Sequence, residues 1–423
     1  MQRRTFLHSS LTMGGLIAVA TLPLRRALAA DAPVGNRRKF IFVMNYGGWD
    51  PTRVFAPEFD NLSVDMERAA QSASMGNVTF VDHEMRPSVR AFMERYYGDT
   101  LIVKGILVPS VAHENCLRLA MTGTTRQDAS DWPAIMAGVQ GAQFALPHVV
   151  AAGPSFPGEF GAFVTRTGTS GQLPALLDGS IIGWSDTPTA APAEAAEAVM
   201  DEYLSQRLAA LAQLAVPGRE ATLAAAYATS LQRARSLKGL ADIVDWSQGS
   251  TFVEQAKFGV DVLALGVSRC VTLSFSYNGW DTHVANDIYQ SQNFEMLFKG
   301  LGGLMDLLAS VPGEYSATLA EETVVIVLSE MGRTPQLNAG QGKDHWPYTS
   351  AMLVGAGVTG NRVVGAYDAL YYGKKLDLAS AEVDDDAGQS LSSDVLGATL
   401  LALADVDSED YLPGVARVDG LLA

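Results

Sequence analysis

The residue types best suited to chemistry in this chain follow three apolar runs. "FIFVMNYGGWD" ends on Asp50, "CVTLSFSYNGWDTH" ends with Asp281 and His283, and "VVIVLSEMGRTP" contains Glu330. A fourth segment, "GKDHWP", adds His345 soon afterwards. Carboxylates and imidazoles together favour a divalent cation, zinc or manganese first, with magnesium or calcium as alternatives. Buried side by side without a cation, the carboxylates would repel one another. These five residues therefore predict one divalent-metal site.

Local spacing supports this prediction. Residues two apart in an extended backbone point to the same side, so Asp281 and His283 can face one ligand. Gly47 and Gly48 allow the backbone to turn sharply beside Asp50. Arg333 follows Glu330 closely and can bind an oxyanion through two parallel N–H groups. We therefore expect Arg333 to stabilise negative charge on a substrate.

Each of these residues also has a structural alternative. The two aspartates can simply begin turns, as aspartate often does. The two histidines can be ordinary core or surface residues. Glu330 can form an internal salt bridge with Arg333. The metal site is favoured because three strand ends supply acids and a histidine lies near them, whereas each alternative explains one residue alone.

Apolar runs and helical stretches alternate along most of the chain. The runs are mostly continuous, which is typical of strands buried on both faces. We expect strands at residues 39–45, 78–82, 100–106, 148–152, 270–276, 323–329 and 351–355, and helices at 87–97, 251–268 and 293–310. This alternation predicts an α/β fold with a mostly parallel sheet and helices on both faces. Ligands of such sheets bind outside the carboxyl ends of the strands.

Composition limits the class of protein. The chain has 423 residues, of which 48% are hydrophobic, enough for one large α/β domain. A formal net charge of −16 argues against nucleic acid as a partner. The only two cysteines are Cys116 and Cys270, so neither a disulfide framework nor a cysteine-based zinc site is expected.

Residues 1–30 have the pattern of a signal peptide. "RRTFL" precedes the apolar run "LTMGGLIAVATLPL" and the small-residue segment "RRALAAD". The paired arginines are similar to a twin-arginine signal, with an uncleaved anchor as the alternative. We expect a periplasmic or extracellular protein without stable membrane insertion after cleavage. Residues 31–423 would form the α/β domain, in which the alanine-rich segment 190–245 is a helical insertion.

Two common catalytic motifs can be set aside. "GAGVTG" at 355–360 matches a dinucleotide-binding pattern, but the following "NRVVGAYD" does not open a helix. The chain has no G-x-S-x-G motif, which is the best marker of an α/β-hydrolase serine nucleophile.

The twin-arginine start, "GGWD", "GWDTH", "LSEMGRTP" and "GKDHWP" together resemble the bacterial family catalogued as domain-of-unknown-function 1501. That family is similar to the alkaline phosphatase and sulfatase superfamily. The resemblance covers essentially the mature chain and implies an alkaline-phosphatase-like three-layer α/β/α sandwich with a metal site at the strand ends. It implies metal ligands at Asp50, Asp281, His283, Glu330 and His345.

This chain departs from the superfamily pattern at two places. Glu330-Met331 stands where an Asp-His pair is usual, so one ligand of a second metal is missing. Ala112-His113 stands where relatives tend to have Ser-His, so the sequence does not identify the nucleophile. The candidates are Ser110, His113, Cys116 and Thr122. His113 can be a metal ligand, a general acid–base group or a core histidine.

The resulting hypothesis is an exported metal-dependent hydrolase of phosphate or sulfate esters, acting on a small molecule or a glycan. The metal would polarise the ester, Arg333 would stabilise the transferred group, and His113 would protonate the leaving group. One alternative is a non-catalytic envelope protein that binds metal or glycan on the same fold. Another is a serine or cysteine hydrolase without metal.

Overall fold

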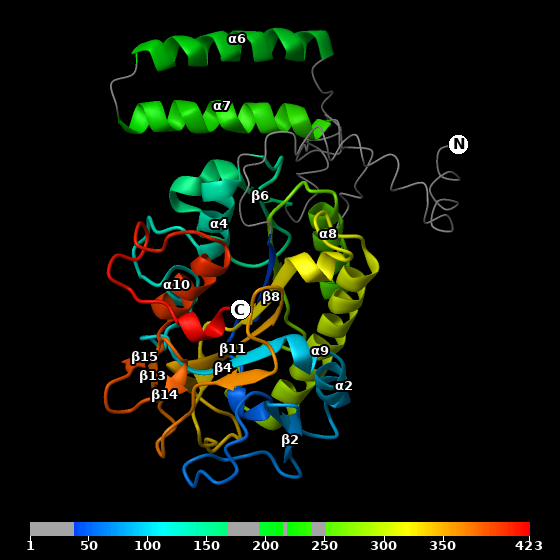
Figure 1. Ribbon diagram of the computed structural model, residues 1–423, viewed down its shortest axis with the longest axis vertical. Coiled ribbons are helices and arrows are strands. Elements are labelled where there is room, and N and C mark those ends of the chain that lie inside the picture. The colour runs from blue at the N-terminus through cyan, green and yellow to red at the C-terminus, as the bar shows by residue number, and fades with distance from the viewer. Residues whose placement is uncertain (1–37, 142, 168–193, 215–217, 239–250) are drawn as a thin grey trace, which may run out of the picture.

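A computed structural model describes residues 38–141, 143–167, 194–214, 218–238 and 251–423. Within these ranges the chain forms an eight-stranded sheet with helices on both faces (Figure 1). In sheet order the strands are β12 (Arg362–Val364), β4 (Thr100–Leu107), β11 (Tyr348–Gly355), β8 (Thr323–Leu328), β1 (Lys39–Met44), β7 (Cys270–Ser274), β5 (His148–Val150) and β6 (Val164–Arg166).

The central sheet is mostly parallel, as predicted. Only β11 breaks the pattern among these strands, because it pairs antiparallel with both β4 and β8. The run at 78–82 is not part of this sheet. It forms β3 (Val78–Asp82), which pairs with β2 (Gln71–Met75) in a separate antiparallel hairpin. The two residues between them include Gly76 at φ +56°, which suits a tight hairpin turn.

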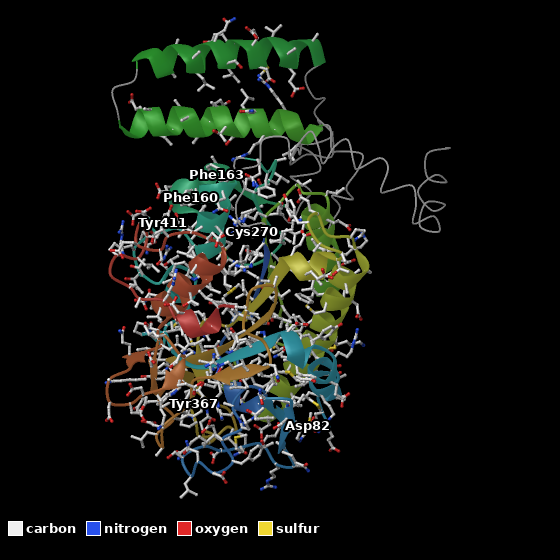
Figure 2. All side chains as sticks on the ribbon, in the orientation of Figure 1. Asp82, Phe160, Phe163, Cys270, Tyr367 and Tyr411 are labelled. Carbon is white, nitrogen blue, oxygen red and sulfur yellow. The ribbon has the colours of Figure 1, made fainter. Side chains whose placement is uncertain are left out.

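The sheet separates two hydrophobic cores, which confirms the three-layer sandwich. Helices α2 (Pro87–Tyr96), α8 (Phe252–Ala264) and α9 (Asn286–Ser310) supply one core. Helices α3 (His113–Thr122), α4 (Trp132–Gln140) and α10 (Ser393–Leu403) supply the other. Alternate residues of β1 divide between them: Ile41 and Val43 face the first core, and Phe40 and Phe42 face the second. Figure 2 shows side chains filling both layers.

Smaller elements complete the described part of the chain. β9 (Gly332–Arg333) and β10 (His345–Trp346) form an antiparallel pair. A small sheet contains β14 (Glu382–Val383), β13 (Lys375–Asp377) and β15 (Gln389–Ser390). Among the described helices, none is both long and apolar enough to cross a membrane.

Helices α6 (Glu194–Leu214) and α7 (Arg219–Lys238) lie side by side outside the sandwich (Figure 1). Arg233 of α7 donates to the carbonyl of Ala162 at 2.6 Å and stacks over the Phe163 ring at 4.1 Å. These contacts attach α7 to the body of the protein on the side where Figure 2 labels Phe163. The signal-peptide prediction at 1–30 and the ends of the segment 190–245 lie outside the described residues.

Buried His148 couples the fold to pH. Its Nε2 lies 2.8 Å from Thr272 Oγ1, and its Nδ1 is buried without a hydrogen-bond partner among the described residues. Burial, with a smaller contribution from Arg166, lowers the pKa of His148 from 6.5 to about 3. In the unfolded chain His148 therefore binds a proton as the pH falls below 6.5, whereas in the folded protein it binds that proton only near pH 3.

We predict that the free energy of unfolding falls as pH drops from 6.5 towards 3, and that His148→Gln reduces this slope. The substitution keeps a polar group near Thr272 but removes the titrating ring. Urea unfolding of both proteins at several pH values between 4 and 7 measures the slope. Identical slopes in the two proteins would show that His148 does not contribute.

Candidate metal centre

Neighbouring parallel strands bring the predicted acids to one edge of the sheet. β1 pairs in parallel with β7 on one side and with β8 on the other, so their carboxyl ends lie together. The loop after β1 carries Asp50, the loop after β7 carries Asp281 and His283, and the turn after β8 carries Glu330. β10 adds His345, which lies opposite Arg333 in the β9–β10 pair.

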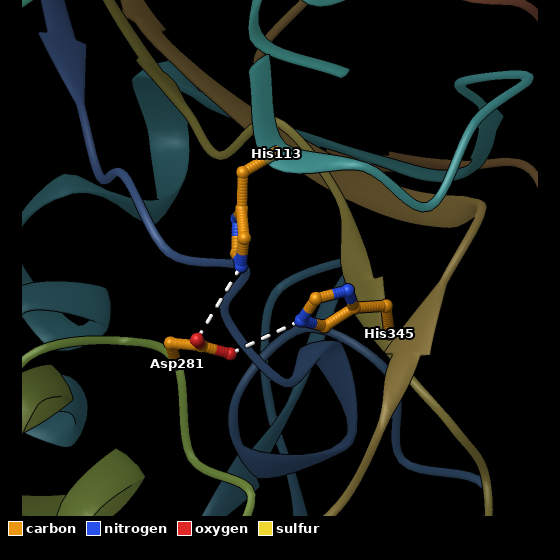
Figure 3. A group of neighbouring side chains, drawn as sticks. All are labelled: His113, Asp281 and His345. Atoms are coloured by element: carbon orange, nitrogen blue, oxygen red, sulfur yellow. Dashed lines mark hydrogen bonds and ion pairs between the residues drawn. The ribbon is translucent and has the colours of Figure 1, made fainter. Parts of the chain in front are cut away.

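The side chains that meet are Asp281 and three histidines. His113 Nε2 lies 3.4 Å from Asp281 Oδ2, and His345 Nε2 lies 3.2 Å from Asp281 Oδ1 (Figure 3). Ligand atoms of these three residues all lie within 4.8 Å of one another, close enough to hold one metal ion. His283 joins them from one side, since its Nε2 lies 3.0 Å from both Asp281 Oδ1 and His345 Nε2. We call these four residues the histidine cluster.

Hydrogen bonds on the far side of each ring fix its tautomer. Every Nδ1 faces an oxygen that can only accept, so it carries the proton in a neutral ring. The pairs are His113 with Glu330 Oε1 at 2.8 Å, His283 with Asp344 Oδ1 at 2.9 Å, and His345 with the carbonyl of Val111 at 2.7 Å. The Nε2 atoms therefore present lone pairs to one another and to Asp281. Four acceptors directed together favour a bound cation, a protonated ring or water molecules that donate between them.

Such outer hydrogen bonds are the usual way in which proteins orient metal-binding histidines. His113 shows this most clearly, because its Nε2 is buried and makes no hydrogen bond within the described part of the chain. The side chains of His113 and His345 are about one fifth exposed, and those of Asp281 and His283 are 46% and 44% exposed. The cluster therefore fits a cation that solvent or a substrate can reach.

Glu330 supports the histidine cluster from below. It is fully buried, and besides His113 its carboxylate accepts the N–H groups of Gly47 at 2.8 Å and Gly48 at 3.3 Å. The hydrogen bond that His113 donates to Glu330 raises the pKa of His113, although burial opposes it. Glu330, predicted as a metal ligand, hydrogen-bonds to His113 and to the loop after β1.

Arg333 is also buried, and its guanidinium is hydrogen-bonded mainly to backbone carbonyls. Nε donates to Gly48 O at 2.8 Å, Nη1 donates to Lys343 O at 3.1 Å, and Nη2 contacts Gly47 O, Trp280 O and Asp281 Oδ1. Burial alone would raise the pKa of Asp281, but the hydrogen bond and charge of Arg333 hold it at about 2. The guanidinium has no exposed surface. The structure therefore places Arg333 under Asp281, and not where a substrate would touch it.

The structure does not bring Asp50 into the histidine cluster. Its carboxylate is fully buried and lies 3.0 Å from Lys343 Nζ and 3.6 Å from Arg53 Nη1. Thr52 and Asn286 donate to its two oxygens at 2.6 Å and 2.9 Å. The charges of Lys343 and Arg53 lower the pKa of Asp50 against the opposing effect of burial. Asp50 thus has a neutralising partner in Lys343, two residues before His345.

Helix α9 supplies a residue that the sequence did not single out. Gln290 accepts from the N–H of Asp50 at 2.9 Å and donates to the carbonyl of Trp280 at 3.0 Å. It therefore fastens the two Gly-Trp-Asp loops to each other. Trp49 and Trp280 of these loops are fully buried, and their rings meet edge to face at 6.2 Å. The repeated Gly-Trp-Asp phrase marked these two loops in the sequence. Gln290 itself was missed because α9 begins at Asn286, seven residues before the predicted helix.

Two of the nucleophile candidates face away from solvent. Cys116 is fully buried, and burial raises the pKa of its thiol to about 11. Thr122 is buried at the end of α3, where its hydroxyl donates to the carbonyl of Arg118 at 2.8 Å. Ser110 is partly exposed in the segment before α3, and its Oγ accepts from the N–H of Ala112 at 3.2 Å.

Gly47 offers a test of how tightly the loop after β1 is held. It has φ +123°, and a Cβ there would lie 2.9 Å from the backbone nitrogen of Asp281. We predict that Gly47→Ala lowers the free energy of unfolding by about 3 kcal/mol or more, because backbone strain and a clash with main chain add together. Urea unfolding measures the loss.

Gly279→Ala is the matched control. Gly279 has φ +79°, but its Cβ would meet no atom within 4 Å. It should therefore lose only the backbone contribution, about 1–2 kcal/mol. Equal losses at the two positions would contradict the close packing of the two loops.

Comparisons with known proteins place these motifs in a family. The family model described as protein of unknown function (DUF1501) matches residues 37–412. A search of curated protein sequences finds no match.

Several solved structures show a remote likeness to the chain. A protein of the alkaline phosphatase superfamily from Vibrio parahaemolyticus has a TM-score of 0.40 at 10% identity, over 95% of this chain and 78% of its own. The PsFucS1 sulfatase from Pseudoalteromonas sp. has a TM-score of 0.39 at 11% identity, over 96% and 75%. Ps i-CgsB, solved with k-i-k-neocarrahexaose, has a TM-score of 0.40 at 10% identity, over 90% and 75%. Likenesses this remote assign no role to any residue.

Proposed function

The chain belongs to the DUF1501 family, as its motifs predicted, and we propose that it is an exported metal-dependent hydrolase of phosphate or sulfate esters. The observation that carries the proposal is the histidine cluster, in which three imidazole nitrogens and one carboxylate converge as acceptors. Twin-arginine export and a periplasmic or extracellular location are inferred from residues 1–30 alone.

His113, Asp281 and His345 are the proposed primary ligands, because their atoms lie within common reach. His283 is the adjacent fourth donor. A donor set rich in imidazole favours zinc, with manganese next, over magnesium or calcium, which prefer oxygen ligands. A cation held there would polarise an ester oxygen and acidify a bound water.

The protein's own residues have separate tasks in this proposal. Glu330 keeps the Nε2 lone pair of His113 directed into the cluster, and Arg333 keeps Asp281 ionised. Asp50 and Lys343 form an internal ion pair that fixes the loops beneath the site. The earlier assignments of Asp50 and Glu330 as ligands and of Arg333 as the oxyanion group are therefore replaced by positioning roles.

The alternative of a non-catalytic protein that binds metal or a glycan is favoured by one observation. Of the nucleophile candidates, Cys116 and Thr122 are buried with their side chains already engaged or unreactive. Hydrolysis would then depend on Ser110 or on a water molecule as the nucleophile, whereas a protein that only binds would need neither.

We predict that the purified protein contains about one zinc or manganese ion per chain and that Asp281→Ala abolishes it, because this carboxylate contacts all three histidines. Elemental analysis after gel filtration measures the metal. His83→Gln is the control, since His83 bonds to the backbone of Arg68 and Met85 and not to the cluster. Unchanged metal in Asp281→Ala would overturn the ligand assignment.

We further predict that the zinc- or manganese-loaded protein hydrolyses at least one of p-nitrophenyl phosphate, bis-p-nitrophenyl phosphate and p-nitrophenyl sulfate. Chelator should abolish turnover, and His345→Ala should lower it at least a hundredfold. Release of nitrophenolate measures the rate. Absence of turnover despite bound metal would favour the binding alternative, and chelator-resistant turnover would favour a hydrolase without metal.

A further inference from the structure

A metal-bound phosphate or sulfate group needs hydrogen-bond donors for the oxygens that the cation does not hold. The sequence offered Arg333 for this purpose, but its guanidinium is buried and bonded to the carbonyls of Gly47, Gly48, Trp280 and Lys343. Lys343 is equally buried and is held by Asp50 and Thr52. Neither cation can reach an anion bound at the histidine cluster.

Tyr46 lies beside the cluster with an uncommitted donor. Its ring centroid is 5.4 Å from that of His113, at an interplanar angle of 49°. The residue is 45% exposed, and its hydroxyl has no hydrogen-bond partner among the described residues. It belongs to neither of the two cores that flank the sheet. Packing in the two cores therefore does not account for a large aromatic side chain at this position, and the ring contact with His113 accounts for the ring but not for the hydroxyl.

The backbone around Tyr46 is held firmly on both sides. Asn45 donates from its N–H and its side-chain amide to the carbonyl of Leu328, at 2.9 Å and 3.1 Å. Gly47 donates to Glu330, the same carboxylate that orients His113. The backbone that carries the phenol is thus fixed relative to His113, so binding of a ligand has only the side chain of Tyr46 left to order.

We propose that the Tyr46 hydroxyl donates a hydrogen bond to the anionic group of a ligand bound at the histidine cluster, the role that the sequence suggested for Arg333. The inference rests on the proposed function, because it requires a bound cation and an oxyanion. Tyr46 is then a substrate-contacting residue, and the group it recognises is a tetrahedral oxyanion such as a phosphoryl or sulfuryl group.

Binding of inorganic phosphate and sulfate to the zinc-loaded full chain, measured by titration calorimetry, tests the proposal. Tyr46→Phe keeps the ring against His113 and should leave zinc content and thermal stability unchanged. It should raise the Kd for the tighter-binding anion about tenfold, as expected for loss of one hydrogen bond to a charged group. Tyr277→Phe, an exposed tyrosine in the loop after β7 without a ring contact to the cluster histidines, should leave the Kd unchanged.

The outcomes separate this inference from the proposed function. If the wild type binds an anion and Tyr46→Phe binds it equally well, the role of Tyr46 is wrong while the metal site stands. If Tyr277→Phe weakens binding as much as Tyr46→Phe, the effect is not specific to Tyr46 and the inference fails. If zinc is bound but neither anion binds to the wild type, the inference fails together with the hydrolase proposal.

Discussion

Two buried charges of opposite sign hold the loop after β1 from both sides. The Glu330 carboxylate accepts hydrogen bonds from the N–H groups of Gly47 and Gly48. The Arg333 guanidinium donates to the carbonyls of the same two glycines. Each charge then reaches one residue of the site, Glu330 to His113 and Arg333 to Asp281. One short turn after β8 therefore positions His113 and Asp281, which come from two other segments of the chain.

This arrangement explains why buried charges are tolerated at the edge of the sheet. A buried carboxylate or guanidinium is strongly unfavourable unless its hydrogen-bonding groups are satisfied. Here the partners of Glu330 and Arg333 are N–H and carbonyl groups of the loop after β1 that have no partner within the turn. The loop and the two buried charges therefore stabilise each other. The same need accounts for the Asp50–Lys343 pair below the loop, where each charge would otherwise be isolated.

The sequence predicted the general architecture because its signals are local. Continuous apolar runs identified β1, β7 and β8, and their parallel order put the polar residues that follow at one edge. It missed the antiparallel direction of β11 and the separate hairpin containing β3, because strand direction and partner depend on tertiary packing. Periodicity also placed the start of α9 too late, which concealed Gln290.

Within the site, the sequence identified residue types correctly but could not assign them. An acid after a buried strand can bind a cation, as proposed for Asp281, or satisfy a neighbouring charge, as Asp50 does with Lys343. Only the distances distinguish these outcomes. His113 comes from the start of α3, far along the chain from the other cluster residues, and its hydrogen bond to Glu330 holds it in the cluster.

We propose that His113, Asp281 and His345 hold one divalent cation, with His283 beside them. Zinc K-edge X-ray absorption on the loaded protein tests it most directly. The account predicts two or three imidazole nitrogens and a carboxylate oxygen at about 2.0–2.2 Å from the metal. A spectrum with oxygen ligands alone, or with no imidazole scattering, would contradict it.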